Sequence, residues 1–247
     1  MRAVVALVFT AVAVTILLGG TSTAQPAAQS AAVERLPTPT VYLRDCGVCH
    51  GAEGRGTDSG PSIAGVGRAL VDYEISTGRM PIPQPDSKIV RRPARYSATE
   101  TRALVDYVAA FGTGGSGGPD IPRLDVGGAD LAAGGEQYRL QCAACHAWAG
   151  DGGALAHREA PGLHRASATQ IAEAIRTGPG TMPAFGAAAL DDEQLAGVVR
   201  YVRYLNRPRD RGGFGLWHLG PVPEGAVAWL VGLALLILAT RWIGEKS

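Results

Sequence analysis

The chain has 247 residues, which allows one large domain or two small ones. Its formal net charge of +1 gives no reason to expect nucleic acid or another polyanion as a partner. Glycine accounts for 34 residues, about twice its usual share, which indicates short helices joined by many loops. Small glycine-rich domains bury little apolar surface, so we expect a bound group to complete the core.

The N-terminal segment is apolar. Residues 3–20 carry almost no polar side chain and follow a single charge at Arg2. This pattern is typical of a secretory signal peptide or of an uncleaved first membrane helix, and its length leaves both interpretations open. Under either interpretation, the residues that follow lie outside the cytoplasm.

The cysteines give the strongest signal in the sequence. All four lie in two C-x-x-C-H motifs, which consist of Cys46, Cys49 and His50 and of Cys142, Cys145 and His146. One C-x-x-C could be a redox dithiol or half of a zinc site, but two copies, each followed by histidine, are typical of covalently attached c-type haem. The thiols would tether the haem through its vinyl groups, and the histidine would reach the iron from the same helical turn.

The two motifs belong to an internal repeat that predicts two helical modules. Tyr42 and Tyr138 each lie four residues before the first cysteine, and an amphipathic helix closes each module, starting near Ser97 and Asp191. The fold class is therefore expected to be all-α.

A proline follows each motif within a glycine-containing turn. Pro61 and Pro161 are predicted to offer a backbone carbonyl to the Nδ1–H of the axial histidine, which would fix the imidazole ring. A plain turn proline is the alternative.

The methionines complete the predicted iron ligands. Apart from the initiator, the chain contains only Met80 and Met182, at matching places in the two modules and each before proline. A thioether is a soft, weak donor that suits haem iron, and His/Met ligation raises the reduction potential. We expect His50 with Met80 on one iron and His146 with Met182 on the other.

Other histidines compete with this ligand assignment only in the second module. His157 and His164 remain possible sixth ligands there, and His218 is interpreted as interfacial. With both axial positions filled, no coordination site is left for a substrate, which favours electron transfer over peroxidase or oxygenase chemistry.

The C-terminal segment has the pattern of a single membrane span. An apolar run begins at Ala226, Trp229 and Trp242 flank it, and Arg241 and Lys246 follow. Aromatic belts and trailing basic residues are typical of an anchor with a cytoplasmic end. A buried amphipathic helix is the alternative, but no polar face is present.

Together these residues resemble tandem class I cytochrome c domains. The ordered set is more specifically similar to the dihaem cytochrome c subunit of the actinobacterial cytochrome bcc complex, a menaquinol:cytochrome c reductase. The segments that carry this resemblance are residues 60–67, 76–81, 134–142, 152–155, 177–185 and 212–225.

The resemblance implies the dihaem electron-transfer subunit of a respiratory quinol:cytochrome c reductase (translocase), with the quinol chemistry on other subunits. It implies a cytochrome b subunit, a Rieske iron–sulfur subunit and a haem-copper oxidase as partners, and haem domains on the outer face of the cell membrane. The alternatives are a stand-alone anchored dihaem carrier, a dihaem subunit of a haem-copper oxidase, a dihaem peroxidase and a structural assembly subunit.

The expected organisation has seven segments. They are residues 1–24 (signal peptide or first membrane helix), 25–40 (linker), 41–111 (first cytochrome c domain), 112–130 (glycine-rich linker, with a flexible hinge at residues 112–118), 131–207 (second cytochrome c domain), 208–225 (juxtamembrane segment) and 226–243 (transmembrane anchor).

Overall fold

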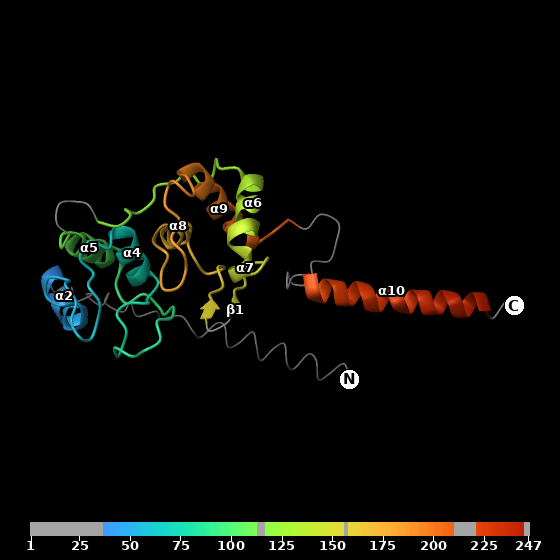
Figure 1. The fold of residues 1–247 in the computed structure, drawn as a ribbon, viewed down its shortest axis with the longest axis horizontal. Helices are drawn as coiled ribbons and strands as arrows, with labels where there is room; N and C mark the ends of the chain where they lie inside the picture. Colours follow the sequence, from blue (N-terminus) through green and yellow to red (C-terminus); the bar gives the residue numbers. More distant parts are fainter. Residues whose placement is uncertain (1–36, 113–116, 156–157, 210–220, 245–247) are drawn as a thin grey trace, which may run out of the picture. The chain divides into compact units, whose positions relative to one another are not determined.

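The computed structural model describes residues 37–112, 117–155, 158–209 and 221–244 (Figure 1). The N-terminal apolar segment, His157 and His218 lie outside these residues. The described part is mostly helical. Its helices are α2 (Thr38–Asp45), α3 (Gly47–His50), α4 (Arg68–Ser76), α5 (Ala98–Ala109), α6 (Leu131–Gln141), α7 (Ala143–His146), α8 (Ala168–Thr177), α9 (Asp192–Leu205) and α10 (Pro221–Gly244).

The same order of helices occurs twice. In the first half, residues 37–112, a short helix leads into a one-turn helix that carries the C-x-x-C-H motif, and two longer helices follow. The second half, residues 129–209, repeats this order with α6 to α9. The closing helices α5 and α9 begin at the predicted caps, where Ser97 with Glu100 and Asp191 with Gln194 form capping boxes.

A small hairpin departs from the all-α expectation. Strands β1 (Gly153–Leu155) and β2 (Arg158–Ala160) pair antiparallel, with Gly153 opposite Ala160. The hairpin lies between His146 and Pro161, which are 15 residues apart, whereas 11 residues separate His50 from Pro61. The four additional residues of the second half are therefore accommodated by this hairpin, whose strands of three residues each are too short to give a clear alternating pattern in the sequence.

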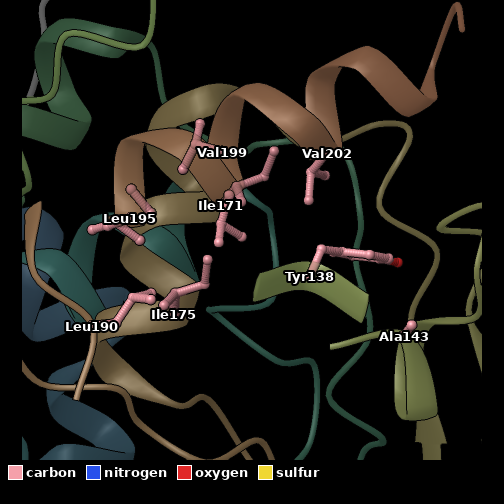
Figure 2. Close-up of a cluster of buried hydrophobic side chains, with 10 residues drawn as sticks. Tyr138, Ala143, Ile171, Ile175, Leu190, Leu195, Val199 and Val202 are labelled. Atoms are coloured by element: carbon pink, nitrogen blue, oxygen red, sulfur yellow. The ribbon is translucent and has the colours of Figure 1, made fainter. Parts of the chain in front are cut away.

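Each half has its own hydrophobic core. In the second half, one buried cluster includes Tyr138 of α6, Ile171 and Ile175 of α8, and Leu195 and Val199 of α9 (Figure 2). The corresponding cluster of the first half is formed by Tyr42, Val71, Ile75, Leu104, Val105 and Val108.

Helices α6 and α9 cross with their backbones close together. A Cβ atom at Gly134 would collide with the backbone carbonyl of Gly197, so α9 leaves no room for a side chain at this position. Glycine normally weakens a helix interior, and here the close packing offsets that cost.

The described part of the linker packs on both halves of the chain, and most of the hinge expected at residues 112–118 lies outside it. Gly118 N donates to Gly65 O at 2.7 Å, and Ala69 N donates to Pro119 O at 3.1 Å. Ile121 then packs on the core of the first half, while Leu124 and Val126 pack on that of the second. Residues 113–116 lie outside the described part.

Helix α10 is long and apolar enough to cross a membrane. Its segment Val222–Gly244 has a mean hydropathy of 2.0, and its 24 residues span about 36 Å, against about 30 Å for a bilayer core. The helix begins five residues before Ala226, because proline is well tolerated in the first turn of a helix. Helix α10 therefore supports membrane anchoring.

Replacing Gly134 by Ala tests the packing of α6 on α9. The gain in helix propensity is about 1 kcal/mol, but the collision with the Gly197 carbonyl should cost more, for a net loss of about 1–3 kcal/mol. We expect a lower midpoint of thermal unfolding, measured by circular dichroism of the purified chain. Gly186→Ala is the matched control, because nothing lies within 4 Å of the added methyl group. Equal midpoints for the two variants would contradict the proposed close approach.

Candidate haem sites

Each C-x-x-C-H motif spans the junction between two short helices. Cys46 follows α2 and caps α3, and the backbone hydrogen bond from His50 N to Cys46 O, at 2.9 Å, closes a single helical turn. His146 N donates to Cys142 O over the same distance. The helical turn therefore brings both cysteines and the histidine of each motif onto one short stretch of backbone.

A backbone carbonyl orients each motif histidine. His50 Nδ1 lies 2.8 Å from Pro61 O, and His146 Nδ1 lies 2.9 Å from Pro161 O. A carbonyl oxygen can only accept a hydrogen bond, so Nδ1 carries the proton and donates it. Nε2 is then the nitrogen available to a metal. This is the geometry that the predicted role of the two prolines requires.

A buried tyrosine supports the residue after each histidine. The Tyr42 hydroxyl donates to Gly51 O, and the Tyr138 hydroxyl donates to Ala147 O, both at 2.7 Å. Both tyrosines are fully buried. The sequence showed the spacing of these tyrosines from the motif but not their role, which depends on the turn that returns the chain to the helix.

The residue after each histidine has a positive φ angle combined with an extended ψ angle. Gly51 has φ of 79° and ψ of 159°, and Ala147 has φ of 63° and ψ of 163°. Glycine adopts this conformation freely, whereas alanine pays about 1–3 kcal/mol for it. The hydrogen bond to the Ala147 carbonyl helps to hold the turn in place despite this strain.

Burial keeps the first cysteine of each motif protonated. Burial, together with the nearby Asp45 carboxylate, raises the pKa of Cys46 to about 11. Burial also raises the pKa of Cys142 to about 11, with Cys145 as a smaller contribution. A reactive redox dithiol needs a thiolate, which the surroundings of Cys46 and Cys142 disfavour. In the described part of the chain, no group of three or more His, Cys, Asp and Glu residues could hold a metal ion.

An apolar crevice opens beside the second motif. Its wall contains Cys142, Ile175 and Phe185, and the half-buried Met182 packs against the same cluster as Cys142. Met80 is also half-buried, and its backbone N donates to Glu74 O at 3.0 Å. The crevice is narrow, with a volume of about 10 Å³, and its apolar wall is the surface that a flat apolar group tethered through Cys142 would contact.

The surroundings of Met80 favour an anionic group. The Nη1 atom of Arg79 is buried and has no hydrogen-bond partner among the described residues, and the guanidinium lies 4.7 Å from the centre of the Tyr73 ring. Burial, and then the charges of Arg79 and Arg165, lower the pKa of Arg91. Burial raises the pKa of the Glu74 carboxyl and the charge of Arg79 opposes this rise, so that charge is partly balanced. The Nη1 atom without a partner could still donate to a carboxylate of a haem, so the residues present fit this cofactor.

His164 does not suit the role of a sixth ligand that the sequence left open. Its Nδ1 lies 2.7 Å from Asn206 Oδ1, and its Nε2 lies 2.9 Å from Asp151 Oδ1. Both ring nitrogens are engaged, so neither is available to iron in this arrangement.

Replacing Tyr138 by Phe tests the tyrosine support. The Ala147 carbonyl would lose its donor inside the protein, at an expected cost of about 1–3 kcal/mol in the free energy of unfolding, measured by urea denaturation. Tyr201→Phe is the control, because no hydrogen bond of the Tyr201 hydroxyl is found in the part of the chain that the structure describes. A cost no larger than that of the control would argue against the tyrosine's role.

Comparison with known proteins identifies the family. The sequence model of "Cytochrome C oxidase, cbb3-type, subunit III" matches residues 129–202. The cytochrome bc1 complex cytochrome c subunit of Mycobacterium leprae is 37% identical over 217 residues, which cover 84% of this chain and 74% of that protein. The subunit of the same name from Corynebacterium diphtheriae is 36% identical over 226 residues, with coverages of 84% and 79%. Cytochrome c6 of Bryopsis maxima is 36% identical over 85 residues, or 30% of this chain and 91% of that protein. The chain therefore belongs to the family of cytochrome c subunits of the cytochrome bc1 complex.

Proposed function

We propose that this chain is the dihaem electron-transfer subunit of a respiratory quinol:cytochrome c reductase and passes electrons toward a terminal oxidase. The observation that carries the proposal is the duplicated histidine geometry. His50 with Pro61 and His146 with Pro161 make the same hydrogen bond, and a buried tyrosine supports the next residue in both halves. The family model matches residues 129–202, in the second half. The proposal assigns a haem site of the same kind to the first half.

In this proposal each half holds its cofactor with its own residues. The two cysteines of each motif tether the haem covalently, and the histidine presents Nε2 while its Nδ1 donates to the proline carbonyl. That hydrogen bond raises the basicity of the ring and fixes its direction. Met80 and Met182 would each supply the second protein ligand to the iron of their half, and Arg79 would pair with a carboxylate of the first haem. Bound haem supplies a one-electron iron couple.

The partners follow from the family. The relatives are named as subunits of a cytochrome bc1 complex, and we propose that this chain works beside a cytochrome b subunit and a Rieske iron–sulfur subunit. The haem-copper oxidase would receive the electrons. Helix α10 would hold both halves at the outer membrane face with the C-terminus in the cytoplasm. Quinol oxidation would then lie on other subunits.

A second candidate rests on a specific observation. The family model that matches residues 129–202 is named for subunit III of a cbb3-type oxidase, so the chain could instead serve as a cytochrome subunit of a haem-copper oxidase. Both roles use the same haem sites and differ in the neighbouring subunits.

Purification of the tagged chain in mild detergent distinguishes the two candidates. We expect a cytochrome b protein and a Rieske protein to accompany it, identified by mass spectrometry. Recovery of an oxidase core without these two proteins would overturn the first proposal and favour the second.

Replacing either proposed axial methionine by Leu tests the ligand assignment. Leucine has nearly the same volume but no donor atom, so each variant should lose the methionine–ferric charge-transfer band of one haem and lower the potential of that haem alone. The two variants, Met80→Leu and Met182→Leu, serve as controls for each other. An unchanged spectrum in one variant would refute that methionine as a ligand.

A further inference from the structure

The two halves meet where α4 packs against α8 (Figure 1). Gln170 of α8 donates from Nε2 to Ser76 Oγ at 3.1 Å, and Arg91 donates from Nη2 to Gln170 Oε1 at 3.0 Å. At the edge of this contact, Lys88 Nζ lies 3.4 Å from Glu159 Oε2, with both side chains exposed. These contacts join residues more than seventy positions apart in the chain.

A pair of carboxyl groups lies one turn along the same contact. Glu173 follows Gln170 by three residues on α8, and Asp72 precedes Ser76 by four on α4, so both pairs lie on the facing sides of the two helices. Asp72 is, after burial, the group that raises the pKa of Glu173, so the two carboxyl groups lie close to each other across the contact. Two ionised carboxylates at such a place would repel each other and neither could donate a hydrogen bond, so the pair is stable when one of the two carries a proton.

The burial of Glu173 explains why its carboxyl group stays protonated. Glu173 has an exposed fraction of 0%, and neither carboxyl oxygen receives a hydrogen bond from an N–H or hydroxyl group of the described residues. A buried carboxylate without a donor or counter-ion is strongly disfavoured, so the neutral acid is the stable form. Burial first, and then Asp72, raise the pKa of Glu173 to about 9.

The neighbouring charges do not neutralise Glu173. On α4, Tyr73 is the next ionisable group that interacts with it, and Arg79 lies over the Tyr73 ring. Arg91, from the loop before α5, is directed to Gln170.

The charges where α8 meets α9 form a pair of their own. Arg176 of α8 donates to Asp192 at the start of α9, at 2.6 Å, and also to Leu190 O at 2.5 Å. Arg176 is therefore not directed to Glu173, and the acid pair keeps its own proton.

We propose that packing of α8 on α4 takes up one proton, which Glu173 and Asp72 share, so that the contact between the two halves is a proton-linked latch. The latch needs only the folded chain. For electron transfer, the latch would hold the geometry between the two haems best at acidic pH. This consequence rests on the proposed function.

The direction of the pH dependence follows from proton counts in the two states. When the halves separate, Glu173 is exposed to water and ionises near its ordinary value of 4.5, whereas in the contact it stays neutral up to about pH 9. The closed state therefore binds one more proton between these values. The contact is strongest below pH 4.5, weakens about tenfold for each pH unit up to about 9, and weakens no further above that.

Infrared spectroscopy of the full-length holoprotein in detergent tests the proposal. A buried neutral acid gives a carbonyl stretch that is separate from the carboxylate bands. We expect this band at pH 7 in the difference spectrum between the wild type and Glu173→Gln, which removes the signal of other buried acids such as Glu74, and its loss on titration through about pH 9. Glu136→Gln, on the exposed face of α6, is the matched control and should retain the band. Absence of the band from this difference spectrum at pH 7 would overturn the proposal.

A second variant tests whether the proton belongs to both halves. In Asp72→Asn, the amide of the first half can donate to a Glu173 carboxylate, so the band should titrate at least one pH unit lower than in the wild type. An unchanged titration would mean that Glu173 holds its proton without Asp72, which would refute the shared latch. Neither measurement depends on the axial ligands or on co-purified subunits, so this inference can fail while the proposed function stands, and the reverse.

Discussion

The hydrogen bond between each motif histidine and a proline carbonyl determines which ring nitrogen is left for iron, and much of each half is organised around it. The carbonyl must lie in a loop that returns to the helix carrying the motif. That return is held by further hydrogen bonds at matching positions, because His50 O accepts from Gly56 N and His146 O accepts from Gly152 N. The buried tyrosines hold the next peptide group. The loop can also vary in length without moving these points, since the β1–β2 hairpin is accommodated between His146 and Pro161.

The parts of the fold that the sequence could predict are those set by local rules. The C-x-x-C-H spacing identified the motif turns, and capping residues located the starts of α5 and α9. Long-range packing could not be derived in this way. The glycine-rich linker reads as flexible by composition, yet Gly118 bonds to Gly65 because the glycines allow two backbones to approach closely. Likewise, nothing local marks Glu173 as buried, because α4 of the other half covers it.

The two halves are similar but not equivalent. The stretch from Met80 to the Ser97 cap is longer than that from Met182 to the Asp191 cap. The additional residues of the first half include Lys88 and Arg91, which reach Glu159 and Gln170 of the second. These additional residues of the first half therefore form part of the contact with the second half. The family model matches residues 129–202, in the half without these additional residues.

The packed linker also changes how strong the contact between α4 and α8 has to be. Residues 117–126 join the two halves while packing on both, through backbone bonds to Gly65 and through Leu124 and Val126 on the second core. The halves consequently meet at a high effective concentration, in the millimolar range or above for short connections. A contact far too weak to hold two separate proteins together would still be nearly saturated here. Such a contact can respond to the gain or loss of a single proton without the risk that the two halves drift apart.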